Sequence, residues 1–434
     1  MGTPRCRWSG NTGRAGAADA AFSPLDEELE LGTERFDPWL TESIVLLGTV
    51  LPFERVPLVL ERLTRVPVSA ETVRRVTEAV GRAQVGRETV EAERVRATLP
   101  MPTQGPAVQQ LSLDGAMVPL VGGEWAEVKT LALGEVTTTA AADGTATTRT
   151  TALSYFSRLT DADTFREQAR GELSRRGTAV AGVVCAVQDG AEWQQRFVDH
   201  HRPDAVRILD FPHAVEHLAT VGRAVFGSGT EAHSDWLGVQ AHTLKHGDPT
   251  QVLDTLRSLD VTRAVDPQAA SLRTEALTYF EKRRAHLAYA DFRKLGYPIG
   301  SGAIESANKL VVEARLKGSG MHWLRANVSP MVSLRALLCS DRWATEWPHL
   351  WRARLADAPR QRPRPDLTPS PTTSPAPVAG PTPVPPPPPT GAAPLPRSTP
   401  ASPPLIVDGH PTKAHPWSKP FFRSRQRNPL HATT

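Results

Sequence analysis

The chain has 434 residues and a formal net charge of +4; 40% of its residues are hydrophobic and 22% are charged. This length predicts about two to three domains. Its three cysteines, Cys6, Cys185 and Cys339, form no Cys-x-x-Cys pair and are too few for a disulfide framework, so we expect a reducing, cytoplasmic compartment. No apolar run is long enough to cross a membrane and no signal-peptide core is present, so neither membrane insertion nor secretion is expected.

Proline and charge divide the chain unevenly. Residues 358–434 contain 23 of the 40 prolines, with nine Lys/Arg and two Asp/Glu, a net charge of +7. Residues 1–357 therefore carry a net charge of −3, so the positive charge of the whole chain comes from the tail. We expect this Pro-rich tail to be disordered and the Gly/Ala/Thr-rich residues 1–35 to form a poorly ordered arm.

The next region has the pattern of short helices. They are expected at 39–51, 53–66 and 69–81. In the last of them Ser69 occupies an N-cap position and Gly81 is expected to end the helix. Arg74, Arg75 and Arg82 lie on this helix, and the two helices joined by RVPV are compatible with a DNA-binding helix-turn-helix. An ordinary small helical bundle would have the same pattern.

Strand-like patterns begin after residue 100. Three runs, QQLSLDGAMVPL, WAEVKTLALGEV and ATTRTTALSYF, are separated by the turn signals GG and ADGT. A helix at 161–176, a buried strand TAVAGVVCAV, a helix at 191–201 and a strand AVRILD follow. The order βββαβαβ, then a further helix, is that of the RNase H-like fold. We therefore predict an α/β protein with a mixed sheet, whose first three strands are antiparallel and whose fourth and fifth are parallel.

From Phe211 to about Leu295 every pattern is helical, which is too long for a connection within a compact sheet and indicates an all-α insertion. The segment GYPIGSG then precedes a helix at 301–316, and residues 281–357 hold thirteen Lys/Arg and seven Asp/Glu, a net charge of +6. The predicted regions are the arm at 1–35, the helical DNA-binding region at 36–100, the first part of the RNase H-like core at 101–212, the helical insertion at 213–296, the second part of the core at 297–357 and the Pro-rich tail at 358–434.

Three carboxylates fall on elements that this topology makes neighbours. Asp114 is in the first strand, Asp189 follows the fourth strand, and Glu305 is in the first turn of the helix expected beside them. Converging carboxylates would hold two divalent cations, Mg²⁺ or Mn²⁺, which catalyse in-line phosphodiester displacement. Each residue alone also has an ordinary explanation, because Asp before Gly commonly forms turns and Glu is favourable near a helix N-terminus.

The helix that carries Glu305 is expected to be amphipathic. Its apolar stripe should consist of Ile304, Ala307, Val311 and Ala314. The adjacent face should carry Glu305, Asn308, Lys309 and Val312. Lys309 lies one turn from Glu305, where an ordinary i, i+4 ion pair is the alternative to a role with phosphate.

Several segments carry a family resemblance. They are SLDGAMVPL, GEWAEVKTLALGEV, VQDGAEW, ILDFPHAVEHL, YPIGSGAIESANKLVVEARLKGSGMHW and SLRALLCSDRW. Together they resemble the ISKra-type insertion-sequence transposases, which are DDE enzymes related in architecture to the Mutator-like group. The resemblance runs from about Leu25 to Trp343, and PIGSGAIE is its most specific motif. It implies an RNase H-like core with a helical insertion, Mg²⁺ dependence, and cleavage and strand transfer at transposon ends.

The resemblance places the first acid on Asp114 and the third on Glu305. For the second acid, Asp189 has the expected place after the fourth strand, while Asp210 and His213 match an Asp-x-x-His signature after the fifth. We interpret Asp189 as the metal ligand and Asp210 with His213 as an accessory pair, with Asp210 as the alternative second acid.

One feature departs from the resemblance. Such proteins often have two Cys-x-x-Cys pairs before SPLDE, which form a zinc ribbon, but only Cys6 is present there. Because tetrahedral zinc needs four ligands, no zinc ribbon is expected in this arm. Either the helix-turn-helix alone finds DNA, or this copy is a decayed or misassigned reading frame.

Two further functions compete with transposition. Residues 213–217, His-Ala-Val-Glu-His, satisfy the HxxEH pattern of a zinc metallopeptidase, with Glu281 or Glu305 as a third ligand. Nothing else in the sequence supports peptide hydrolysis. The other alternative is a non-catalytic repressor on the same fold, which would bind transposon ends and would not need the acids.

The basic stretch from Lys282 to Arg325 is the expected phosphate-contacting surface, with binding that weakens as salt rises. The expected DNA-contacting residues are Arg74, Arg75, Lys309, Arg315, Lys317, Trp323 and Arg325, of which Trp323 would stack on a base. Double-stranded DNA, as transposon ends and target, is the expected partner. We also expect a homo-oligomer on DNA, associated with the nucleoid in the cytoplasm.

Overall fold

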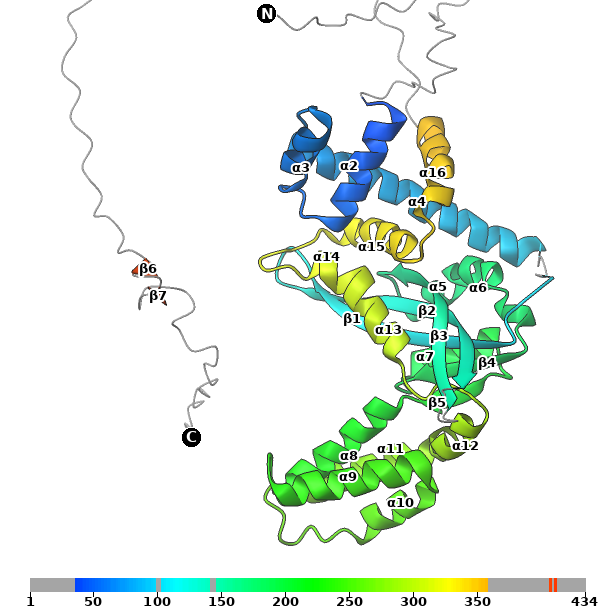
Figure 1. The fold of residues 1–434 in the computed structure, drawn as a ribbon, viewed down its shortest axis with the longest axis vertical. Helices are drawn as coiled ribbons and strands as arrows, with labels where there is room; N and C mark the ends of the chain where they lie inside the picture. The colour runs from blue at the N-terminus through cyan, green and yellow to red at the C-terminus, as the bar shows by residue number, and fades with distance from the viewer. Residues whose placement is uncertain (1–35, 99–102, 141–145, 358–405, 408–409, 412–434) are drawn as a thin grey trace, which may run out of the picture. The chain divides into compact units, whose positions relative to one another are not determined.

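The computed structural model describes residues 36–98, 103–140, 146–357, 406–407 and 410–411 (Figure 1). The arm predicted at 1–35 and nearly all of the predicted tail lie outside these residues. The chain divides into two compact units, Met1–Pro365 and Asp366–Thr434. In the second unit the structure describes a short antiparallel pair, β6 (Ile406–Val407) with β7 (His410–Pro411).

Three helices begin the first unit. They are α2 (Pro38–Val50), α3 (Val56–Thr64) and α4 (Ala70–Thr98). The side chain of Asp37 caps α2 by accepting a hydrogen bond from the Leu40 amide at 2.8 Å. The Ser69 hydroxyl accepts one from the Thr72 amide at 3.2 Å, so the predicted start of the third helix is confirmed. Their apolar faces form one core with α15 (Arg325–Cys339) and α16 (Trp343–Asp357).

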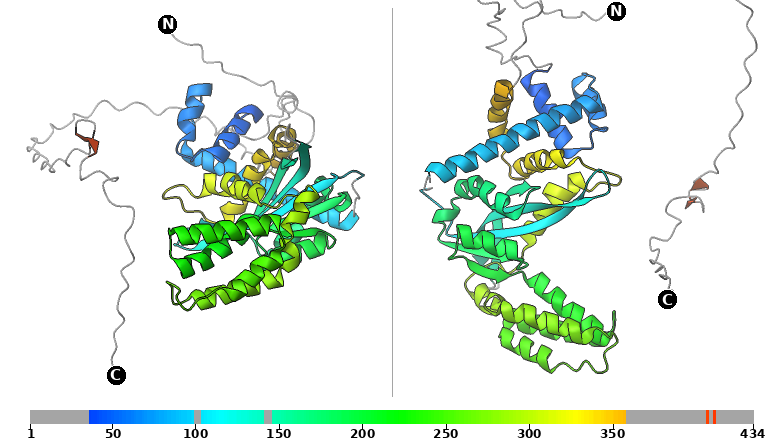
Figure 2. Two further views of the ribbon diagram at one scale, coloured as in Figure 1. Left: turned by 60° about the horizontal axis from the view of Figure 1, so that its bottom comes forward. Right: turned by 180° about the vertical axis from the view of Figure 1, so that it is seen from behind.

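The predicted end of the third helix is wrong, because α4 is 29 residues long and passes through Gly81 to end at Thr98. A Cβ atom at Gly81 would lie 2.7 Å from the carbonyl oxygen of Pro330 on α15, so glycine serves here as a close-packing residue. The long helix therefore connects the N-terminal helices to the rest of the unit (Figure 2).

Replacing Gly81 with alanine is expected to lower the free energy of unfolding by about 1–3 kcal/mol, because α4 and α15 must move apart. Gly86 on the same helix is the matched control, since a Cβ there meets nothing within 4 Å. Gly86→Ala should stabilise by about 0.5–1 kcal/mol through helix propensity. Urea denaturation of both variants measures the difference, and equal effects at the two positions would contradict the packing argument.

A five-stranded mixed sheet forms the centre of the unit, and the mixed α/β class predicted from the sequence is confirmed. The strands are β1 (Val108–Pro119), β2 (Trp125–Ala140), β3 (Ala146–Arg158), β4 (Val183–Gln188) and β5 (Val206–Leu209). Their spatial order is β3-β2-β1-β4-β5. Strands β1 to β3 are antiparallel neighbours, whereas β4 runs parallel to both β1 and β5.

Helices cover both faces of the sheet. One face packs Leu111, Leu113 and Phe156 against the helices between β3 and β5. These helices are α5 (Ala162–Gln168), α6 (Arg170–Arg175) and α7 (Glu192–His201). The other face packs Ala116 and Val118 against α13 (Gly302–Ala307) and the elements after it. Figure 1 shows α13 crossing the sheet over β1 and β2.

Between β5 and α13 all regular elements that the structure describes are helical, as the pattern predicts. They are α8 (Phe211–Phe226), α9 (Glu231–His246), α10 (Pro249–Ser258), α11 (Ala269–Lys282), the 3-10 turn η2 (Arg284–Leu287) and α12 (Tyr289–Lys294). Their core is continuous with Cys185 and Val187 of β4 and Ile208 of β5. This insertion is therefore packed directly on the end of the sheet.

The helix predicted at 301–316 is interrupted. After α13 comes a π-helical segment, η3 (Asn308–Glu313), and then α14 (Ala314–Leu316). A π turn contains one residue more than an α turn and rotates the following side chains relative to the helix face. The predicted stripe is therefore correct as far as Val311 and wrong beyond it, since Val312 is buried and Ala314 is exposed.

No helix among the described residues is both long enough and apolar enough to cross a membrane.

Candidate active site

Asp114 lies in the middle of β1, on the sheet face that packs against α13 and η3. One carboxylate oxygen, Oδ1, accepts a hydrogen bond from the Gly115 amide at 2.7 Å. The other, Oδ2, accepts one from Nδ2 of Asn308 at 2.7 Å. The first predicted acid is therefore held between the strand backbone and the π segment.

Burial, together with the negative charge of Asp189, raises the pKa of Asp114 to about 6, although the hydrogen bonds from Gly115 and Asn308 act to lower it. Asp114 and Asp189 are thus close enough to interact electrostatically. A carboxylate with a raised pKa beside a second carboxylate is typical of functional sites, and a bound cation would offset the unfavourable charge of its ionised form.

Asp189 directly follows β4 and is held by two parts of the chain. Its Oδ1 accepts a hydrogen bond from the Ala191 amide at 2.9 Å, at the N-terminus of α7. Its backbone carbonyl accepts one from the Tyr279 hydroxyl, and that of Gly190 accepts one from Nη2 of Arg283 at 2.8 Å. Both donors lie in or directly after α11, so the helical insertion holds the turn that presents Asp189.

Position 190 in this turn requires a glycine. Its φ of +84° is unfavourable for other residues, and the Arg283 side chain occupies the place of a Cβ atom.

Glu305 is exposed on α13, one turn before Asn308, whose backbone amide bonds to the Glu305 carbonyl. The described residues include no group of three His, Cys, Asp or Glu side chains arranged to hold a metal ion. Asp114 and Asp189 therefore interact electrostatically, and Glu305 lies one helical turn before Asn308, which contacts Asp114.

Asp210, the alternative second acid, is buried and committed to backbone contacts. Its Oδ2 caps α8 by accepting a hydrogen bond from the His213 amide at 3.0 Å, and its Oδ1 accepts one from the Ser301 amide at 2.6 Å. The Asp-x-x-His spacing is thus the spacing of a helix N-cap. Through Ser301, Asp210 also fixes the start of α13, which carries Glu305.

Asp210→Ala is expected to lower the free energy of unfolding by about 1–3 kcal/mol, because it removes the cap and leaves the Ser301 amide buried without a partner. Asp210→Asn, which can still cap α8, should be milder. Chemical denaturation measures both. If Asp210→Ala instead left stability unchanged and abolished metal-dependent nicking, while Asp189→Ala spared nicking, Asp210 would be the second acid.

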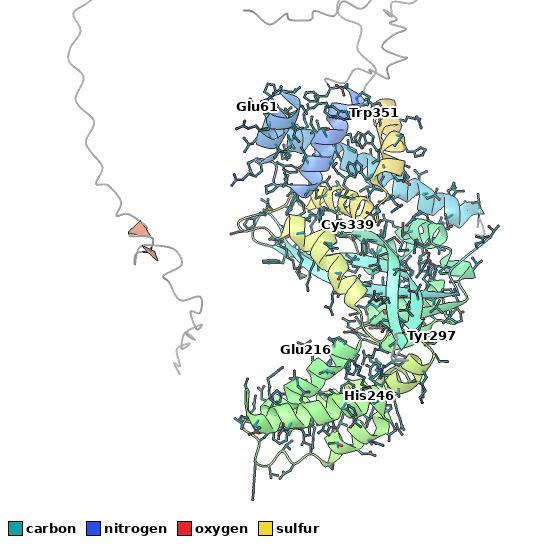
Figure 3. All side chains as sticks on the ribbon, viewed as in Figure 1. Glu61, Glu216, His246, Tyr297, Cys339 and Trp351 are labelled. Atoms are coloured by element: carbon teal, nitrogen blue, oxygen red, sulfur yellow. The ribbon has the colours of Figure 1, made fainter. Side chains whose placement is uncertain are left out.

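The HxxEH residues do not assemble a zinc site. The His217 ring stacks on Tyr279 with centroids 4.1 Å apart, and burial lowers the pKa of His217. Glu216, labelled on α8 in Figure 3, is exposed, and Glu281 forms an ion pair with Arg257 at 2.8 Å. No third ligand accompanies the two histidines within the part of the chain that the structure describes.

Two of the predicted DNA-contacting residues, Arg315 and Trp323, lie in the core. The Arg315 guanidinium lies over the rings of Phe53 and Trp323, and its Nε donates to the Gly48 carbonyl at 3.1 Å. Burial lowers the pKa of Arg315 to about 10. Trp323 is 6% exposed and donates to the Leu316 carbonyl at 3.2 Å. Arg315 thus joins α14 to α2, and neither buried side chain presents a surface for a nucleotide.

The other predicted cations are more accessible. Arg75 and Lys309 are exposed, and the Arg325 side chain is 64% exposed, 3.8 Å from Glu124. Arg74 forms ion pairs with Glu71 and Glu78, and Lys317 forms one with Glu313 at 2.7 Å.

Sequence reasoning assigned no role to Asn308, Tyr279 or Arg283. Asn308 had a usable signal, because it lies three residues after Glu305 on the same expected helix face. Tyr279 and Arg283 had none, since their partners at Asp189 and Gly190 are about 90 residues away and only the packing of the insertion brings them together.

No family model matches the sequence, and no match was found among the curated proteins.

Proposed function

We propose that the chain is a DDE-type transposase, similar to the ISKra type, that cleaves DNA and transfers strands at the ends of an insertion sequence. The observation that carries the proposal is the electrostatic interaction of Asp114 of β1 with Asp189, which directly follows the neighbouring parallel strand β4, together with the raised pKa of Asp114. The strand order β3-β2-β1-β4-β5, with its directions, supports an RNase H-like core.

The donor set fits hard divalent cations. Asp114 and Asp189 offer carboxylate oxygens, which are the ligands that Mg²⁺ and Mn²⁺ prefer. No ion pair within the described residues engages Glu305, so its side chain is free to turn toward Asp114 as the third acid. Two bound ions would supply an activated water or 3′-hydroxyl and would stabilise the leaving oxygen.

The protein's own contribution is to position these groups. The sheet holds Asp114, the insertion holds the Asp189 turn through Tyr279 and Arg283, and Asp210 holds the start of α13. Because the insertion contacts the acid turn directly, DNA bound to the insertion would influence the position of Asp189. We place DNA contacts on the accessible cations Arg75, Lys309 and Arg325, and we propose a homo-oligomer on DNA in the nucleoid.

The test is nicking of duplexes that carry the sequences flanking the gene, by the full chain with Mg²⁺ or Mn²⁺. Asp114→Ala, Asp189→Ala and Glu305→Ala should each abolish nicking, whereas Ser306→Ala, at an exposed neighbouring position, should not. DNA binding without any nicking by the wild-type protein would instead favour a repressor on the same fold. Nicking that survives Asp114→Ala would refute the proposed active site.

A further inference from the structure

Asn308 combines two features that the proposed reaction does not yet use. The side chain is 8% exposed, and its Nδ2 donates to Oδ2 of Asp114. Its Oδ1 is buried and has no hydrogen-bond partner within the described part of the chain. A buried amide oxygen without a partner costs about 1–3 kcal/mol, so the present orientation of the amide is held only by the hydrogen bond from Nδ2 to Asp114.

A half-turn of the amide about its terminal torsion would exchange the two atoms without changing the shape of the side chain, and it would leave Nδ2 in place of Oδ1 as the buried atom without a partner. The number of unpartnered atoms is thus the same in both orientations, and a bond from Oδ1 to a metal ion would replace the hydrogen bond from Nδ2 to Asp114. Oδ1 would then occupy the present place of Nδ2, 2.7 Å from Oδ2 of Asp114. Two oxygens at this separation repel each other unless a cation lies against both. Adjacent ligands of an octahedral Mg²⁺ ion, each about 2.1 Å from the metal, are about 3 Å apart.

The backbone around Asn308 is suited to this role. Asn308 is the first residue of the π segment, and π turns inside helices occur often at functional sites. The carbonyl of Leu310 in this segment accepts a hydrogen bond from the Arg335 guanidinium of α15, and Val311 and Val312 are buried in the core beneath it. The segment is thus anchored from two sides, and the amide of Asn308 is held at Asp114.

We propose that Oδ1 of Asn308 is a ligand of the divalent cation bound by Asp114, and that its amide turns from hydrogen-bond donor to metal ligand when the ion binds. The inference rests on the proposed function, because it assumes that Asp114 binds a metal. It adds a neutral amide oxygen to the acids, from the helix that carries Glu305.

The experiment measures Mn²⁺ binding to the full chain by electron paramagnetic resonance and calorimetry, without DNA. The variants are Asn308→Leu, Asn308→Asp and Asp114→Asn, with Ser306→Ala as the control on the exposed face of the same helix. Asn308→Leu should weaken Mn²⁺ binding at least about tenfold, in line with the loss of one oxygen ligand. Asn308→Asp should retain it, because a carboxylate oxygen can replace the amide oxygen as a ligand but cannot donate to Asp114.

The outcomes separate the two proposals. If Asp114→Asn abolishes binding while Asn308→Leu leaves it unchanged, Asn308 is not a ligand and the proposed function stands. If Asn308→Asp weakens Mn²⁺ binding as much as Asn308→Leu does, Asn308 acts only as a hydrogen-bond donor to Asp114. That result also overturns this inference. If the wild-type chain binds no Mn²⁺, or Asp114→Asn leaves binding intact, the metal site itself is wrong. Urea midpoints near that of the wild type would show that each variant is folded.

Discussion

Asp114→Asn is expected to stabilise the metal-free protein at neutral pH while it abolishes metal-dependent DNA cleavage. Burial and the Asp189 charge raise the pKa of Asp114 to about 6, so the ionised carboxylate is unfavourable in the folded state. Asparagine has no charge, and its amide can be accommodated because the Asn308 amide can turn and present Oδ1 as an acceptor. Loss of a carboxylate metal ligand should reduce cleavage more than about 10³-fold, or about 4 kcal/mol of transition-state stabilisation.

The effect of Asp114→Asn on stability depends on pH. The folded-state pKa lies above the unfolded value, so the folded protein binds the proton more tightly and the wild type loses stability as pH rises from about 4 to about 6. The extra stability of Asp114→Asn relative to the wild type should therefore be absent below pH 4 and complete above pH 6. Because Asp114 is partly exposed, we expect about 1–2 kcal/mol, or about 2–4 °C in Tm.

Thermal denaturation with EDTA, at pH 4 and pH 7.5, measures the effect. Adding Mn²⁺ should stabilise the wild type and not the variant, because only the wild type can bind the ion at this carboxylate. If the variant were less stable than the wild type at pH 7.5, the ionised form of Asp114 would not be unfavourable in the folded protein, and the prediction would be wrong.

Glu88→Ala is expected to produce the largest loss of stability among the ion-pair variants. Glu88 on α4 forms an ion pair with Arg158 of β3. Its carboxylate also accepts hydrogen bonds from the Ser333 hydroxyl of α15 at 2.7 Å and from the Gln84 amide at 2.9 Å. The Arg158 side chain is 3% exposed, so removing Glu88 leaves an uncompensated buried charge. Breaking such a pair costs about 3–5 kcal/mol.

The two partners of this ion pair should differ in the stability that their replacement costs. Arg158→Met should cost less, because Glu88 is 18% exposed and keeps its hydrogen bonds to Ser333 and Gln84. The double variant Glu88→Ala/Arg158→Met should be more stable than Glu88→Ala alone. Glu91→Ala, which breaks the exposed pair with Arg94, is the control and should cost about 1 kcal/mol or less. If Glu88→Ala costs no more than this control, α4 is not held to the sheet by the buried pair.

Local sequence signals predicted helices and strands well where capping residues and hydrophobic periodicity determine them. The start of α4 at the Ser69 cap, the strand patterns of β1 to β5 and the helical nature of residues 211–294 follow from capping and from hydrophobic periodicity. The end of α4 was missed because Gly81 is also a helix-ending signal, and only the contact with Pro330 shows why a glycine lies inside the helix.

At the candidate site, too, the sequence predicted some features and only tertiary contacts decided the others. The sequence identified Asp114, Asp189 and Glu305 as chemistry-bearing residues, and the first two interact in the structure. It could not distinguish a free carboxylate from one engaged as a helix cap, and so Asp210 remained an alternative. It also assigned Arg315 and Trp323 to the DNA-contacting surface, although Arg315 is buried directly after the π segment and Trp323 is buried where its backbone pairs with Leu120.

The sequence by itself thus determined the order of helices and strands and the types of residue available for chemistry, because both depend on local periodicity and composition. The tertiary structure alone decided which carboxylates meet, which are occupied by backbone amides, and which cations reach the surface. These properties depend on contacts between residues 90 or more positions apart, such as Tyr279 with Asp189 and Asn308 with Asp114, for which no local pattern in the chain provides a signal.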